Sequence, residues 1–173
     1  GIVAVKPANN AERSAAEPVE PRTGTKGNAD QQSTRQAQDW ESVSQALARI
    51  RQAAKLRKKE RFTSLLHHVS VDLLRMSFYA LKRQAAPGAD GVTWADYELR
   101  LDSNIQDLHA RVQQGAYRAL PSRRTYIPKP DGRRRPLGIA SLEDKILQRA
   151  VVAVLSAVYE EDFLGFSYGF RPK

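Results

Sequence analysis

A dense group of positive side chains surrounds one turn signal in the second half of the chain. The stretch RTYIPKPDGRRRPLGIASLEDKILQRAV, residues 124–151, contains Asp131-Gly132, a pair typical of a two-residue hairpin turn. The segment 123–135 holds six cations and one Asp, a local charge of 6 − 1 = +5. One carboxylate cannot neutralise them, so the pattern favours phosphate as the counter-ion, with a solubilising hairpin as the alternative. The cations are Arg123, Arg124, Lys129, Arg133, Arg134 and Arg135.

A second group of cations lies on a helix predicted over residues 41–61. Apolar residues recur there at helical spacing, and positive side chains fill the other faces. Contact with a phosphate backbone and a merely solvated helix face both fit this pattern. The seven cations are Arg49, Arg51, Lys55, Arg57, Lys58, Lys59 and Arg61.

The basic segment needs elements that hold it in place. Strand-favouring residues at 125–127 and alternation at 137–139 predict a β-hairpin, and three prolines restrict it to short strands at a sheet edge. Ser141 with Asp144 three residues later predicts a capping box. The helix that follows, residues 142–158, has a broad apolar face and is expected to be the main core helix.

Two further helices are predicted before the hairpin. Ser70 is a candidate N-cap for a helix that ends before Pro87-Gly88. Thr93 with Asp96 predicts a capping box that opens a single helix running from Trp94 to about residue 115. Trp94 could stack on a base, but its place on the apolar stripe favours the core.

Composition limits the classes of protein that the chain can represent. It has 173 residues, 41% of them apolar, which suffices for one globular body, and it has no cysteine for a disulfide, a thiolate metal site or a nucleophile. The net charge of +9 (28 − 19) predicts a nucleic-acid partner. The apolar run at 150–159 is too short to cross a bilayer, so no membrane span is expected, and a cytoplasmic location fits the absence of cysteine.

The two ends of the chain differ from its middle. Residues 1–40 are polar, lack an apolar repeat and have balanced charge, which predicts a disordered leader. The folded part is then residues 41–173, which carry the whole excess of positive charge. The chain begins with Gly and ends just after a Gly-Phe turn, so both ends are expected to be cut from something longer. No metal site is expected, because neither His67-His68 nor the acidic run 160–162 provides converging ligands.

Three segments together resemble a known family. AAPGADGVTWADYE, the basic segment quoted above, and YGFRP are similar in order and spacing to the N-terminal part of bacterial group II intron-encoded reverse transcriptase/maturase proteins. The resemblance extends over almost the whole chain. It implies an α+β, mostly helical fold: an N-terminal extension, fingers with one basic β-hairpin, and the start of the palm of a right-hand reverse transcriptase, truncated at its C-terminal end.

The resemblance also implies roles for individual residues. Lys129 and Arg135 match positions that contact the triphosphate of the incoming dNTP. The loop that contains Pro87, Gly88, Asp90 and Gly91 matches a template-RNA contact. Group II intron RNA, template RNA and dNTP are the implied partners, and Mg²⁺ is expected for the full-length enzymes of the family.

The chain departs from the family in one important respect. It has no Asp-Asp pair, so the metal-binding aspartates of the family have no counterpart here. This predicts that the chain alone does not polymerise DNA. The alternative function is a non-catalytic RNA-binding module that assists intron RNA folding. The sequence does not indicate an oligomeric state.

Overall fold

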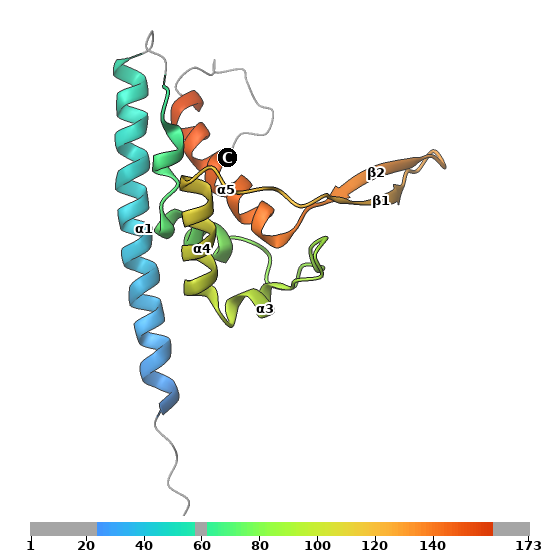
Figure 1. Ribbon diagram of the computed structural model, residues 1–173, viewed down its shortest axis with the longest axis horizontal. Helices are drawn as coiled ribbons and strands as arrows, with labels where there is room; N and C mark the ends of the chain where they lie inside the picture. Colours follow the sequence, from blue (N-terminus) through green and yellow to red (C-terminus); the bar gives the residue numbers. More distant parts are fainter. Residues whose placement is uncertain (1–23, 58–61, 161–173) are drawn as a thin grey trace, which may run out of the picture.

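A long helix, a group of shorter helices and one projecting hairpin make up the structure. The computed structural model describes residues 24–57 and 62–160. The long helix α1 lies along one side of the helical body, and the hairpin points away from it on the other side (Figure 1). The predicted α+β, mostly helical class is confirmed. The elements in chain order are α1 (Gly24–Leu56), the 3₁₀ helix η1 (Leu65–His68), α2 (Val71–Tyr79), α3 (Trp94–Glu98), α4 (Leu101–Gln113), β1 (Arg123–Pro128), β2 (Arg134–Ile139) and α5 (Leu142–Tyr159).

The centre of the core is the predicted core helix α5, which packs against α1 and α2. Its residues Ile146, Ala150 and Val154 are buried, and Phe78 and Leu74 of α2 are completely inaccessible to solvent. Ser70 is confirmed as the N-cap of α2, because its hydroxyl accepts the amide hydrogen of Leu73. No helix in the described part of the chain is both long and apolar enough to cross a bilayer.

The helix predicted from Trp94 to residue 115 is two helices. The capping box of Thr93 and Asp96 is confirmed, but α3 ends at Glu98 and Arg100 has non-helical angles (φ −130°, ψ 37°). The Asn104 side chain donates to the Tyr97 carbonyl oxygen at 3.1 Å, which satisfies a group that the break leaves without its helical partner. Trp94 lies in the core, stacked on the ring of Phe78 with 4.5 Å between centroids.

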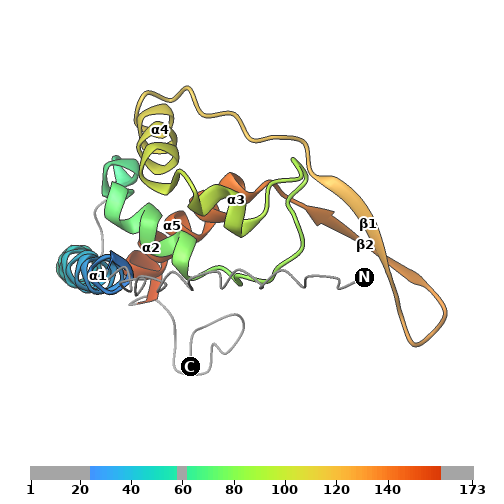
Figure 2. The same cartoon turned by 90° about the horizontal axis from the view of Figure 1, so that it is seen from below.

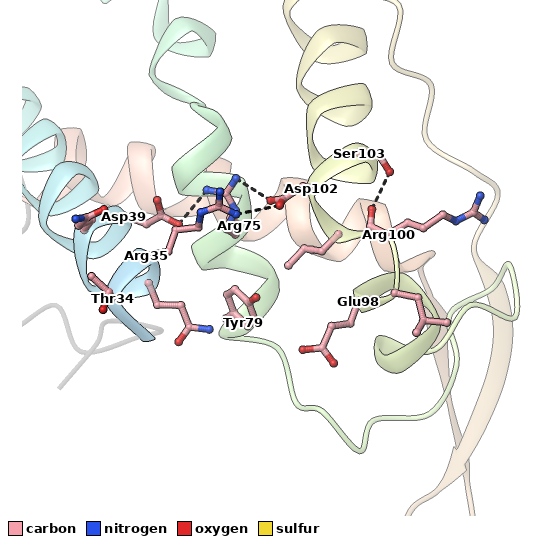
Figure 3. A pocket seen from close by; sticks show the side chains of 13 residues that line it. Thr34, Arg35, Asp39, Arg75, Tyr79, Glu98, Arg100, Asp102 and Ser103 are labelled. Atoms are coloured by element: carbon pink, nitrogen blue, oxygen red, sulfur yellow. Dashed lines mark hydrogen bonds and ion pairs between the residues drawn. The ribbon is translucent and has the colours of Figure 1, made fainter. Parts of the chain in front are cut away.

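The position of α1 corrects two predictions. The helix begins at Gly24 and ends at Leu56, so the leader predicted to be disordered over 1–40 is helical from Gly24 onward, and the helix stops short of residue 61. Residues 1–23 lie outside the described part. Within α1, Asp39 is buried and pairs with Arg75 of α2, with 2.9 Å between Oδ2 and Nη1 (Figure 3). Such a pairing between distant segments is invisible to composition.

The hairpin turn also differs from the prediction. The Lys129 amide donates to the Arg133 carbonyl oxygen at 2.8 Å, and the Gly132 amide donates to the Lys129 carbonyl oxygen at 3.0 Å. The loop therefore has three residues, 130–132, instead of two. Gly132 has a φ of 80°, the left-handed conformation that a three-residue hairpin loop requires at its last position. Pro130 takes the second position of the turn, where a fixed φ is favourable.

Candidate nucleic-acid interface

The register of the hairpin sorts its cations onto two faces. Arg123 pairs with Ile139, Ile127 with Arg135 and Pro128 with Arg134 in the antiparallel ladder. Directly opposed residues share a face and neighbours along a strand alternate, so the register decides which charges lie together. One face carries Arg123, Lys129, Arg133 and Arg135, and the other carries Arg124 and Arg134.

The two residues predicted to bind a triphosphate, Lys129 and Arg135, thus lie on the same face of the hairpin. Residue 129 is opposite residue 133, and residue 135 is the next residue of β2 on that face, which makes the pair diagonal neighbours. Diagonal neighbours in an antiparallel ladder are about 7–8 Å apart at Cα, within reach of one polyphosphate for long side chains. Arg135 is exposed and Lys129 half-buried.

The carboxylates of the described residues leave most of the hairpin charge uncompensated. Arg133 pairs with Asp131, with 2.7 Å between Nη2 and Oδ2, and its amide also donates to Asp131. These hydrogen bonds hold the pKa of Asp131 below its usual range. Within residues 24–57 and 62–160, no salt bridge engages the other five hairpin cations. Their positive potential therefore faces solvent.

The predicted template-contact loop lies at the root of this hairpin (Figure 2). The Ala89 amide donates to the carbonyl oxygen of Ala140, the residue that joins β2 to α5, at 3.2 Å. Gly88 is buried there, and a Cβ on it would lie 2.9 Å from the Leu142 amide nitrogen. Asp90 accepts the Val92 amide hydrogen, and Gly91 has a φ of 78°. Pro87, Asp90 and Gly91 are exposed.

The cations of the predicted basic helix lie elsewhere. Arg49, Arg51 and Lys55 are exposed on α1, while Arg57 follows the end of that helix. Lys58, Lys59 and Arg61 fall outside the described residues. Because α1 and the hairpin flank the helical body on opposite sides, the structure does not combine the two groups into one surface (Figures 1 and 2).

Several residues that anchor the hairpin were not predicted as functional. The Tyr117 hydroxyl donates to Oδ1 of Asp144 at 2.5 Å, and Nη2 of Arg111 donates to both carboxylate oxygens of Glu143, each at 2.9 Å. Burial, followed by the hydrogen bond to Asp144, raises the pKa of Tyr117, so the hydroxyl keeps its proton and remains a donor. At the hairpin root, the sequence indicated only the contact between Ser141 and Asp144, through their three-residue spacing. Ser141 is confirmed as the N-cap, but the Asp144 carboxylate accepts from the Ser141 hydroxyl instead of completing a capping box.

The magnesium site that the resemblance implies for the whole family does not fit the described residues. In residues 24–57 and 62–160, no three His, Asp or Glu side chains come together in a way that could hold a metal ion. The acidic side chains near the hairpin are instead engaged with Arg111, Tyr117, Ser141 and Arg133. We therefore assign no step to a metal in this part of the chain.

Comparison with known proteins bears on this arrangement of a basic hairpin and its supporting loop. The chain is 46% identical over 87 residues to Protein YkfC of Escherichia coli (strain K12), a match covering 50% of this chain and 23% of that protein. It is 38% identical over 73 residues to the group II intron-encoded protein LtrA of Lactococcus lactis subsp. cremoris, a match covering 42% of this chain and 12% of that protein. A 91 kDa protein in the cob intron of Schizosaccharomyces pombe is 40% identical over 72 residues, a match covering 42% of this chain and 8% of that protein.

Two of these three relatives are named as proteins encoded within introns. The chain is a homologue of group II intron-encoded proteins, which confirms the resemblance seen in its motifs. The matches extend over less than a quarter of the length of each of these relatives. No family model matches the chain.

Proposed function

We propose that the chain is the N-terminal extension and fingers part of a group II intron reverse transcriptase/maturase. In this proposal the hairpin binds the triphosphate of an incoming dNTP through Lys129 and Arg135. The loop 87–91 contacts template RNA, and the exposed cations of α1 contact intron RNA. The proposal assigns no catalytic step to the chain itself, because the chain has no Asp-Asp pair.

One observation carries the proposal: five cations, which have no carboxylate partner among residues 24–57 and 62–160, stand on a two-stranded arm whose root joins the core helix α5. A bidentate guanidinium and a compact ammonium group on one face suit the oxygens of a polyphosphate. The loop predicted to contact template RNA adjoins the same root through the Ala89–Ala140 hydrogen bond. A template and a nucleotide bound at these places would be neighbours.

The second candidate is a non-catalytic RNA-binding module that assists folding of intron RNA. The exposed cations of α1 favour it, because they lie on the opposite side of the body from the hairpin and can contact RNA independently. This candidate requires RNA binding and no selective affinity for nucleoside triphosphates. The two candidates therefore differ in what Lys129 and Arg135 do.

RNA binding can be tested with three variants that each remove three exposed cations and lower the net charge from +9 to +6. The hairpin variant changes Arg123, Arg124 and Arg134 to Ala, and the α1 variant changes Arg49, Arg51 and Lys55. The matched control changes Lys82, Arg100 and Arg149, which are exposed on other parts of the body. Affinity for a single-stranded RNA is measured as a function of salt. If all three residues contact phosphates, each binding variant should lower the salt slope by about 2 (0.7 × 3).

The outcome of this comparison is unambiguous. The control variant should keep the slope of the unmodified chain, and an equal loss in all three variants would show a diffuse polycation and refute both candidates. Affinity for a fluorescent nucleoside triphosphate analogue then separates the two candidates. If the hairpin is a triphosphate site, the double variant Lys129→Ala with Arg135→Ala should abolish nucleotide binding. It should also weaken RNA binding less than the three-arginine hairpin variant does. Absence of selective nucleotide binding by the unmodified chain would favour the RNA-binding module.

A further inference from the structure

The hairpin makes its structural connections at its root. The strand residues of β1 and β2 are exposed except for Thr125 and Ile139, which are half-buried. The direction of the arm must therefore be fixed by the segments that enter and leave it. The entering segment runs from the end of α4 through Tyr117 to Arg123, and the leaving segment runs from Ile139 to Ser141, the N-cap of α5.

One buried carboxylate connects these two segments. Asp144, 5% exposed, accepts the Tyr117 hydroxyl on Oδ1 at 2.5 Å and the Ser141 hydroxyl on Oδ2 at 3.1 Å. Tyr117 belongs to the chain that enters the hairpin, and Ser141 belongs to the chain that leaves it. The carboxylate also lies in the first turn of α5, where the helix dipole favours a negative charge.

The ring of Tyr117 is held separately from its hydroxyl. The Arg111 guanidinium lies over that ring, 5.5 Å from its centroid, and its Nη2 donates to both carboxylate oxygens of Glu143, the neighbour of Asp144. The Tyr117 amide also donates to the Arg111 carbonyl oxygen at 3.0 Å. Removal of the hydroxyl alone should therefore leave the ring in place and break only the connection to Asp144.

We infer that Tyr117, Asp144 and Ser141 are positioning residues that fix the direction of the hairpin relative to the helical body. The importance of this connection follows from the length of the arm. Six strand residues extend about 20 Å, so a change of about 10° at the root displaces the tip by roughly 3.5 Å. A displacement of about 1 Å in a positioning group already costs on the order of 100-fold in catalysis. The functional part of this inference rests on the proposed function of the hairpin, whereas its structural part does not.

The direction of the arm can be measured without reference to ligand binding. The chain has no cysteine, so Pro128→Cys on β1 and Gln106→Cys on α4, both exposed, allow a pair of nitroxide labels at chosen sites. Double electron–electron resonance then gives the distribution of distances between the hairpin and the body. Tyr117→Phe should broaden or shift that distribution by about 3–4 Å, the displacement expected for a tilt of about 10°.

Tyr97→Phe is the matched control. Its hydroxyl also donates to a carboxylate in the first turn of α5, Glu143 at 3.4 Å, but Tyr97 lies in α3 and is not part of either segment at the hairpin root. This variant should keep the distance distribution of the unmodified chain. If Tyr117→Phe fails to fold, Asp144→Ala decides the question, because it removes both acceptor oxygens and the arm should again loosen.

The results separate this inference from the proposed function. A distribution in Tyr117→Phe and Asp144→Ala that matches that of Tyr97→Phe would overturn the positioning role, whatever the hairpin binds. A loosened arm that retains the RNA and nucleotide affinity of the unmodified chain would support the positioning role and refute the proposed function. A loosened arm with at least tenfold weaker nucleotide binding would support both.

Discussion

The buried pair between Arg75 and Asp39 should determine whether α1 docks on the rest of the body. Their side chains are 12% and 11% exposed, and Nη1 lies 2.9 Å from Oδ2. In Arg75→Met the Asp39 carboxylate would stay buried without its cation. Breaking a buried pair in this way costs about 3–5 kcal/mol of unfolding free energy. We expect that loss, together with faster amide exchange in the N-terminal half of α1.

Removing the carboxylate of the pair should lower the free energy of unfolding less than removing the guanidinium does. In Asp39→Ala the arginine keeps Asp102 at 3.1 Å and Asp72 at 3.4 Å, so the cost should be about 1–3 kcal/mol. The double variant removes both buried charges and also the Arg75 Nε, a buried group that has no hydrogen-bond partner among the described residues. It should be more stable than Arg75→Met alone, with a coupling energy of about 2 kcal/mol or more.

Urea unfolding followed by circular dichroism measures all of these differences. Arg35→Met is the matched control, because Arg35 also connects α1 to the rest of the body, through Asp102 of α4, but with side chains 64% and 54% exposed (Figure 3). An exposed pair contributes about 0–1 kcal/mol. If Arg75→Met cost no more than Arg35→Met, the claim that the buried pair docks α1 would be wrong.

Two further predictions concern the hairpin and its root. Gly88→Ala should lower the free energy of unfolding by about 1–3 kcal/mol, because its Cβ would lie 2.9 Å from the Leu142 amide nitrogen and 3.1 Å from Ser141 Cα. Gly138→Ala is the control, because its Cβ would meet nothing closer than Ser122 Cβ at 3.6 Å. It should be near neutral when both variants are compared by urea unfolding. The lowered pKa of Asp131 means that its contribution to the turn is present above the ordinary carboxylate pKa and is lost as the pH falls through the lowered folded value. An NMR titration should show that Arg133→Ala raises this pKa, and an unchanged value would contradict the pairing.

The parts of the fold that the sequence predicted correctly depend on local chemistry. Ser70 and Thr93 were identified as N-caps because a side-chain oxygen and a nearby amide are sufficient to form the cap. The core face of α5 follows from helical periodicity alone. The helical structure of α1 just before residue 41 and the break at Arg100 were missed because each involves contacts between segments, the Asp39–Arg75 pair in one case and the Asn104–Tyr97 hydrogen bond in the other.

The candidate interface likewise has features that the sequence predicted and features that depend on packing. The two groups of cations were visible in the sequence, but their location on opposite sides of the body was not, since it depends on how α1 packs. The three-residue loop was mistaken for a two-residue turn because Asp-Gly fits both, and only the register decides between them. The connection from Tyr117 to Asp144 joins residues 27 apart and has no sequence signature.

The register also explains how so much positive charge can stand on one small hairpin. Arg123 and Arg124 face Ile139 and Gly138 across the ladder, and Arg134 and Arg135 face Pro128 and Ile127, so none of these four is opposed to another cation. Lys129 and Arg133 are the exception, and there Asp131 pairs with Arg133 at 2.7 Å. Like charges directly opposed would destabilise a two-stranded ribbon that is marginal by itself. This pattern lets the cations remain in place before any polyanion arrives, as the triphosphate site that we propose would require.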